Sequence, residues 1–288
     1  MHRVAEIANF LILVVGFAVS GIVVRRYPLL SIVCFTIAGA NIVTHGLTEL
    51  RYIWDQVSVN KFPCIYWSAW LLVSLPTIFH ISAELKNLKT KVSVRKLFHV
   101  LIVVMFGPFL VRRTRSEFMA VSGMLVIASL IVIEAVRVST VSPKLSHFLT
   151  SLIRPLLDKK DSSAKIVTSH AELLLAAVGP TILSEIFHVS FSTETLVSGI
   201  LTVGIGDSFA AIVGTSCMQP RTLPWSNKSL QGASAFVISV TACLALTQLL
   251  TPSTLGATIV AAAVEAWIPN FDNVTLPIVF SLVHAFLR

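Results

Sequence analysis

Acidic residues interrupt several long apolar stretches of this sequence, where a lone charge adds nothing to packing. Glu134, Asp207 and Glu265 lie within such stretches, Asp272 lies beside one, and His99 lies near the start of another. Ionisable groups at such positions are costly, and they usually face a partner, a cavity or a bound ion. Carboxylates of this kind are the ligands with which proteins hold Mg²⁺ and, through it, nucleotide phosphates. We therefore take these positions as candidates for chemistry.

The stretch 204–214 (GIGDSFAAIVG) combines small residues with one carboxylate. Small residues recur at 206, 210 and 214, a spacing that lets helices pack closely. Packing does not account for Asp207, because a charged side chain does not help two helices to pack closely. Glycines leave the backbone open to a ligand, so this stretch is predicted to bind a metal-bound nucleotide. The predicted contacts are Gly204, Gly206, Asp207, Ser208 and Gly214.

Two basic segments complement this carboxylate. Arg95, Lys96 and His99 open an apolar stretch, and Arg95 and His99 share a helix face at the spacing i, i+4. They either anchor the helix at the membrane surface or hold a phosphate. Lys228, in the segment Lys228-Ser229-Leu230-Gln231-Gly232, is either another anchor or the fixed cation of a phosphoryl-transfer site.

Two further segments carry polar groups. Glu134 and Arg137 are spaced i, i+3, which predicts an intrahelical ion pair or a buried carboxylate that faces a metal. In the segment 265–273, Pro269 interrupts an apolar stretch between Glu265 and Asp272-Asn273. Interrupted helices at membrane depth are tolerated where they line a cavity.

The composition fixes the protein class. Hydrophobic residues make up 55% of the 288 residues and charged residues only 12%, about half the charged share of a soluble domain. The sequence is therefore predicted to be a polytopic membrane protein, and its basic residues are topogenic rather than nucleic-acid binding. The four cysteines lie far apart without a CxxC spacing, so neither a zinc site nor a disulfide framework is indicated.

The apolar stretches predict an all-α transmembrane bundle of eight to ten spans. We expect two parts, N-terminal spans over 1–90 and a catalytic membrane domain over 91–288. The first span is an alternative candidate for a cleaved signal, although Arg25 and Arg26 directly after it resemble a stop-transfer flank. The expected spans are 7–24, 28–47, 62–83, 97–111, 117–136, 171–191, 195–216, 229–250, 254–268 and 273–287.

The distribution of Lys and Arg predicts the orientation. With ten spans and an outside N-terminus, the inside segments hold 15 of the 22 basic residues. The long segment 137–170 is then an inside surface loop. His99, Arg137, Asp158, Lys228 and Asp272 all fall at the cytosolic face, with Asp207 reached from it. This convergence predicts one cytosol-facing site.

At these residues the chain resembles dolichol kinases, the CTP-dependent polyprenol kinases of the endoplasmic reticulum. Six segments occur in the family's order and spacing. These segments are 95–99, 134–137, 157–162, 204–214, 228–232 and 265–277. The chain departs from the family at Gln231, where a glutamate is usual, and it resembles mainly the C-terminal catalytic portion.

This resemblance implies transfer of the γ-phosphate of CTP to dolichol, with a divalent cation, most simply Mg²⁺, at the cytosolic face of the endoplasmic reticulum membrane. The product, dolichyl phosphate, supports the synthesis of dolichol-linked glycans for protein glycosylation. Asp207, Asp272 and His99 are the implied catalytic residues, with Asp207 and Asp272 on the metal. The implied nucleotide contacts add Arg95, Lys96, Lys228, Ser229 and Gly232, and the supporting residues are Glu134, Arg137, Asp158, Asp161, Glu265 and Asn273.

Two other functions fit parts of the sequence. Another membrane enzyme that uses CTP, such as a phytol or polyprenol kinase or a CDP-diacylglycerol synthase, would use similar groups. A transporter would carry ions on its intramembrane carboxylates, but the paired halves typical of transporters are not evident.

Overall fold

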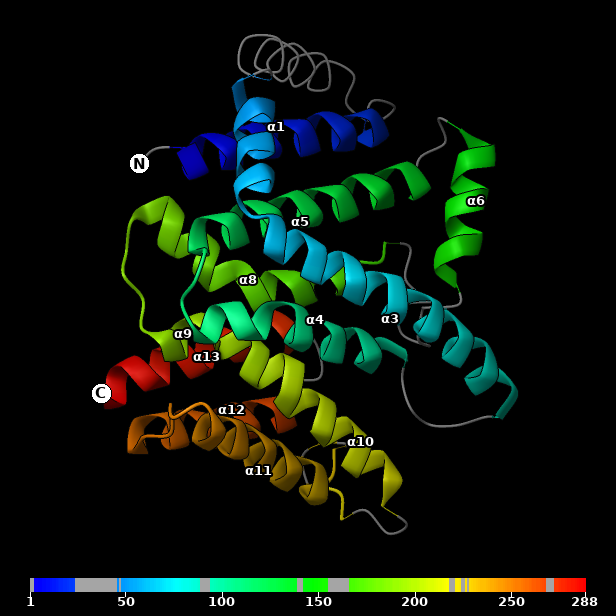
Figure 1. Ribbon diagram of the computed structural model, residues 1–288. Helices are drawn as coiled ribbons and strands as arrows, with labels where there is room; N and C mark the ends of the chain where they lie inside the picture. The colour runs from blue at the N-terminus through cyan, green and yellow to red at the C-terminus, as the bar shows by residue number, and fades with distance from the viewer. Residues whose placement is uncertain are drawn as a thin grey trace. The chain divides into compact units, whose positions relative to one another are not determined.

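A computed structural model describes most of the chain. It covers residues 3–23, 46, 48–88, 94–138, 142–154, 166–217, 221–223, 226, 228–267 and 272–288, without the side chains of 17–23, 82–88, 94–95 and 272. Every regular element in these ranges is a helix (Figure 1). The predicted all-α class is therefore confirmed for them.

The elements follow the predicted apolar stretches closely. In chain order they are α1 (Arg3–Val23), α3 (Lys61–Leu88), α4 (Val94–Val111), α5 (Ser116–Val138), α6 (Pro143–Ile153), α8 (Ser169–Phe187), α9 (Thr193–Leu196), η2 (Ile200–Asp207), α10 (Ser208–Ser216), α11 (Leu230–Leu246), α12 (Pro252–Trp267) and α13 (Asp272–Leu287). Three of the described helices, over Lys61–Ile81, Ser116–Val138 and Ser169–Phe187, are long and apolar enough to cross a membrane. Four shorter helices, including those at Lys96–Val111 and Leu230–Leu246, are also apolar. The expected span 28–47 lies almost wholly outside the described residues.

Two predicted loops contain helices. Residues 48–59 are helical, although they lie between the expected spans 28–47 and 62–83. Within the expected surface loop 137–170, residues 143–153 form α6, none of whose side chains is buried. We missed both helices because each segment mixes apolar with polar residues and contains no continuous apolar run, yet neither has a helix-breaking residue in its interior.

The chain forms two compact units, whose segments alternate along the sequence. The first comprises residues 1–69, 117–171 and 181–189, and the second comprises 70–116, 172–180 and 190–288. In the first unit, Trp67 stacks on Phe118 with ring centroids 5.3 Å apart, and Tyr52 donates a hydrogen bond to Glu117.

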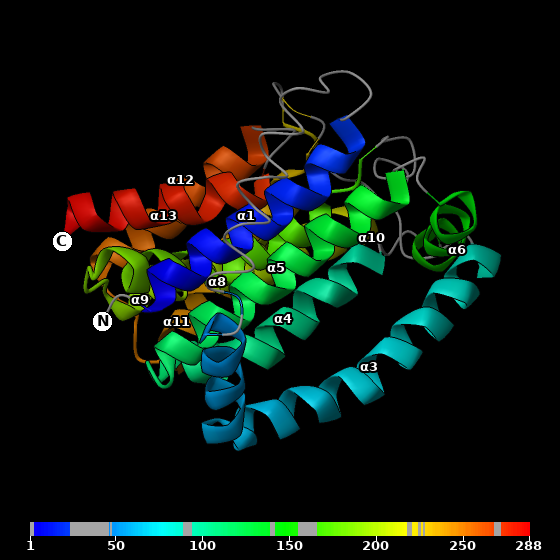
Figure 2. The ribbon, with the colours of Figure 1, turned by 90° about the horizontal axis from the view of Figure 1, so that it is seen from above.

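The second unit is built around a π-helical segment. Where one span was predicted over 195–216, the chain forms α9, then the eight-residue π-helix η2, then α10. Helix η2 packs against α4, α11, α12 and α13. In Figures 1 and 2, α12 and α13 run side by side, with α11 next to α12. π-helices are rare and often occur at functional sites.

The predicted packing role of the small residues is confirmed. A Cβ on Gly206 would lie 2.6 Å from the ring of Phe236, and one on Gly214 would lie 2.9 Å from Ser229 Oγ. In the reverse direction, a Cβ on Gly232 would lie 2.9 Å from the carbonyl oxygen of Ala210. Positions 206, 210 and 214 thus form the face on which α11 packs.

Candidate functional site

A buried carboxylate lies at the end of the π-helix, between two residues of α4. Lys96 Nζ donates to Asp207 Oδ2, and His99 Nε2 lies 3.5 Å from the same oxygen. Asp207 and Lys96 are each 5% exposed, and His99 is fully buried. Burying a carboxylate and an ammonium is favourable only when they are paired, so the pair fixes η2 against α4.

The local sequence explains how these groups meet. Lys96 and His99 are spaced i, i+3 on α4, so they project from one helix face. Gly204 allows α4 to approach η2, because a Cβ at that position would lie 2.5 Å from the side chain of Val103. Lys96 was predicted as a phosphate contact, yet its pairing with Asp207 was not. Arg95 lies in α4, but its side chain is outside the described residues.

A second ion pair joins the loop before α11 to the end of α12. Lys228 Nζ donates to Glu265 Oε1 and also to the backbone oxygen of Glu265 at 2.6 Å. Glu265 is buried, whereas about a third of the Lys228 side chain is exposed. The Lys228 ammonium contacts the last turn of α12, where the helix dipole favours a cation.

Backbone contacts hold Lys228 in place. Leu223 N donates to Lys228 O at 3.0 Å, and Leu230 N donates to Arg221 O at 2.9 Å. The Gln231 side chain also accepts from Arg221 N at 3.0 Å. Gln231 therefore anchors this loop.

The serines predicted as nucleotide contacts both bond to the backbone. Ser208 Oγ donates to Gly204 O at 2.7 Å. Ser229 is the N-cap of α11 and accepts from Gly232 N at 3.1 Å. These bonds give both serines a local structural role, and their contact with a nucleotide stays a prediction.

Several other predicted residues belong to the first unit or lie outside the described residues. Glu134 and Arg137 form the expected intrahelical ion pair, with N–O distances of 2.7 and 2.6 Å, and Glu134 also accepts from Val167 N at 2.6 Å. They belong to the first unit. Asp158 and Asp161 lie outside the described residues, as does the Asp272 side chain.

Asn273, in the first turn of α13, is buried. Helix α12 ends at Trp267 and α13 begins at Asp272, as the proline at 269 indicates.

The carboxylates of Asp207 and Glu265 supply oxygen donors of the type that Mg²⁺ takes. Among the described residues, no three His, Cys, Asp or Glu side chains form a cluster fit for a metal. A cation here would therefore bind to few protein oxygens and rely on other oxygens, which is how Mg²⁺ is usually held beside phosphates.

Comparison with known proteins gives a consistent picture. The chain is 28% identical to a dolichol kinase of Arabidopsis thaliana over 255 residues, covering 82% of this chain and 43% of that protein. It is 30% identical to the Schizosaccharomyces pombe dolichol kinase sec59 over 190 residues, covering 64% of this chain and 37% of that one. Against the Homo sapiens dolichol kinase the identity is 27% over 243 residues, covering 77% and 44%. The chain thus spans less than half the length of these relatives.

No family model and no solved structure matches the chain. The similarity to dolichol kinases nevertheless extends over plant, fungal and mammalian proteins and over most of this chain. The resemblance inferred from the six segments is confirmed: over most of its length the chain is similar in sequence to dolichol kinases.

Proposed function

We propose that this chain is a CTP-dependent dolichol kinase. It transfers the γ-phosphoryl group of CTP to the terminal hydroxyl of dolichol, which gives dolichyl phosphate and CDP. The observation that carries this proposal is the buried Asp207 between Lys96 and His99 in a π-helical break of an apolar span. The names of the similar proteins supply the substrate class.

The charges of the two ion pairs suit this reaction. Phosphoryl transfer needs positioning and neutralisation of negative charge more than it needs covalent chemistry. Without substrate, Lys96 and Lys228 neutralise Asp207 and Glu265. When the nucleotide binds, its phosphate oxygens take the place of the carboxylates as partners of the lysines. Asp207 and Asp272 would be the residues to hold Mg²⁺, which would supply further positive charge at the phosphates.

His99 is suited to accept the proton of the alcohol. Its Nε2 lies 3.5 Å from Asp207 Oδ2, so the carboxylate stabilises the imidazolium that forms. The bond between the alcohol oxygen and the γ-phosphorus forms as the bond from that phosphorus to the β,γ-bridging oxygen breaks. CDP leaves with the electron pair, and the proton goes to a base at the site, either His99 or a carboxylate.

Incubation of the purified chain with γ-labelled CTP, Mg²⁺ and dolichol tests the proposal. Label should move into a lipid that comigrates with dolichyl phosphate. Release of labelled pyrophosphate would instead indicate a CDP-lipid synthase. Transfer to phytol in preference to dolichol would indicate another lipid kinase, and no turnover of CTP would refute the proposal.

Lys228→Ala should raise the KM for CTP by at least about tenfold, or lower kcat, with the KM for dolichol almost unchanged. The reason is that a fixed cation beside phosphates contributes to nucleotide binding and not to lipid binding. Initial rates measured at varied CTP and varied dolichol check this. An equal change in the KM for dolichol would show that Lys228 instead serves to hold α12.

We further propose that the site faces the cytosol from the endoplasmic reticulum membrane, where CTP is available and where dolichyl phosphate is used in glycan synthesis. The excess of Lys and Arg in the inside segments supports this orientation. A lipid alcohol needs an opening toward the bilayer beside a site open to water, which accounts for a kinase site within apolar helices.

Engineered glycosylation tests the orientation. The natural sequons at Asn227 and Asn273 should stay unmodified, because N-glycans are added on the luminal side. A spacer with an N-x-T sequon inserted at Asn60, after the helix 48–59, should be glycosylated in microsomes, whereas the same insertion beside Asp161 should not. The shift in mobility that a glycosidase reverses is the readout. Modification beside Asp161 would place the site away from cytosolic CTP.

A further inference from the structure

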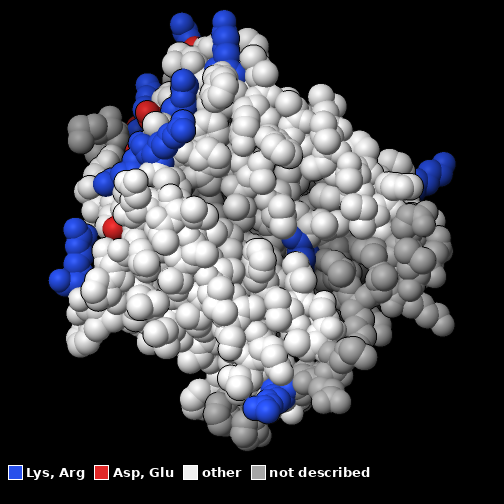
Figure 3. All heavy atoms as spheres, turned by 60° about the horizontal axis from the view of Figure 1, so that its bottom comes forward, with Lys and Arg blue, Asp and Glu red and all other residues white. Residues whose placement is uncertain are grey.

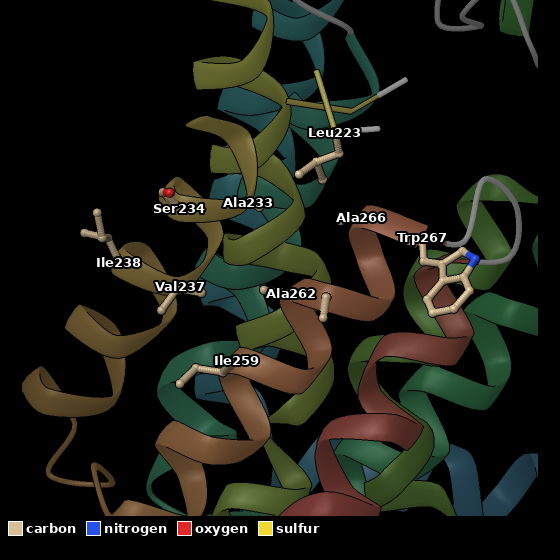
Figure 4. Close-up of a pocket in the computed structure, with 10 residues that line it drawn as sticks. Leu223, Ala233, Ser234, Val237, Ile238, Ile259, Ala262, Ala266 and Trp267 are labelled. Atoms are coloured by element: carbon tan, nitrogen blue, oxygen red, sulfur yellow. The ribbon is translucent and has the colours of Figure 1, made fainter. Parts of the chain in front are cut away.

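An apolar groove of about 940 Å³ runs between α11 and α12 (Figure 4). It is lined by small and branched apolar side chains, and Ser234 is its one polar lining residue among those described. The groove is hollow because alanines lie on both of its walls, Ala233 on α11 and Ala262 and Ala263 on α12. Larger side chains at these positions would fill it.

The groove opens onto an uncharged surface. Ile238 is 69% exposed and Trp267 is 74% exposed. In Figure 3, Lys, Arg, Asp and Glu are sparse on the face shown, with most of them toward its edges and one basic side chain near its middle. In a membrane such a surface contacts acyl chains, so the groove is open to hydrocarbon rather than to water.

One end of the groove adjoins the second ion pair. Leu223, which lines the groove, donates its backbone N–H to Lys228 O at 3.0 Å. On the other wall, Ala266 and Trp267 directly follow Glu265, which accepts from Lys228. The groove thus leads from the bilayer to the Lys228–Glu265 pair. This arrangement suits a ligand with a long hydrocarbon chain and a small polar end.

We propose that this groove binds the isoprenoid chain of the lipid alcohol and presents its hydroxyl end beside Lys228 and Glu265. The inference rests on the proposed function, since it assumes that the acceptor is a polyprenol. The acceptor oxygen must meet the γ-phosphate, so the isoprenoid chain has to end near a lysine that binds phosphate. Lys228 is the one of these lysines that the groove adjoins. Branched and methyl-bearing side chains along the groove, such as Val237 and Ile259, suit a methyl-branched chain.

A second groove of similar volume provides a matched control. It lies on the other side of α11, against η2 and α10, and is lined by Phe209, Ala242 and Cys243 among others. It reaches the loop before α11 through Arg221 and Gln231, which already bond to each other. None of its lining residues belongs to α12, the helix that carries Glu265, although Ser234 and Ile238 line both grooves.

The test compares Ala263→Trp, which fills the first groove, with Ala242→Trp, which fills the second. Ala263→Trp should raise the KM for dolichol by at least about tenfold, corresponding to about 1.4 kcal/mol, with the KM for CTP within about twofold. Ala242→Trp should leave both constants within about twofold. Equal KM values for dolichol in the two variants would overturn the inference.

A labelling experiment on the unaltered chain covers the case in which Ala263→Trp does not fold. A polyprenol that carries a photoactivatable diazirine should label peptides from 252–267, and excess dolichol should prevent the labelling while phosphatidylcholine should not. Equal protection by phosphatidylcholine would mean that the groove holds ordinary bilayer lipid and would refute the inference. Failure of the proposed function is a distinct result, because the unaltered chain would then transfer no label to dolichol.

Discussion

Asp207→Asn should lower the rate of label transfer from CTP to dolichol by at least about a hundredfold. Asparagine has nearly the same shape but cannot hold a divalent cation as a carboxylate does, nor stabilise a protonated His99. Loss of a preorganised electrostatic group of this kind typically costs a factor of about 10² to 10³ in kcat. Initial rates at saturating CTP and dolichol measure the effect. Activity within about tenfold of the unaltered chain would remove Asp207 from the reaction.

A loss of activity has to be separated from a loss of structure, because Asp207 also neutralises the buried Lys96. The double variant Lys96→Met with Asp207→Asn removes both charges, so it should unfold at nearly the temperature of the unaltered chain. It should still be inactive. Recovery of activity in the double variant would show that Asp207 is needed only for folding.

Much of the helical framework is predictable from the sequence because it follows hydropathy. The stretch predicted over 229–250 becomes a helix at Leu230–Leu246, and the one over 97–111 becomes Val94–Val111. The packing face at 206, 210 and 214 was predictable for a related reason, since a small residue at every fourth position has one structural use. Helices in segments that mix apolar and polar residues, such as 143–153, were missed because the same criterion does not detect them.

The π-helix before Ser208 could not be predicted. Its backbone differs from an α-helix only in the register of its hydrogen bonds, and the segment 200–207 is as apolar as its neighbours. Its effect is to set the direction of the Asp207 side chain toward α4. The sequence identified the residue, whereas its orientation depends on tertiary packing against Val103 and Phe236.

The partners in the two ion pairs could not be predicted from the sequence either. Isolated charges of both signs within apolar stretches must pair somewhere, and this rule does identify Lys96, Asp207, Lys228 and Glu265 as candidates. It does not say which lysine meets which carboxylate. That choice is made by tertiary contacts, which join residues 111 positions apart in one case and 37 in the other.

Lys96→Met should lower the free energy of unfolding strongly, because it leaves a buried carboxylate without its main counterion. Removing one partner of a buried ion pair typically costs about 3 to 5 kcal/mol. We expect the loss to fall toward the lower end of this range, since His99 remains 3.5 Å from Asp207 Oδ2 and partly replaces the lysine. Thermal unfolding in detergent measures the effect, and a matched Lys144→Met change on the exposed α6 should be nearly neutral.

The pair is tested most sharply by a double-mutant cycle. If Lys96 and Asp207 stabilise the fold through each other, the variant that carries Lys96→Met and Asp207→Asn should lose less stability than the sum of the single changes. Coupling between residues in direct contact is about 0.5 to 3 kcal/mol. Additive losses would mean that the two groups act independently. The π-helix would then owe its position against α4 to apolar packing alone, and the two charges would be retained for the bound nucleotide rather than for the fold.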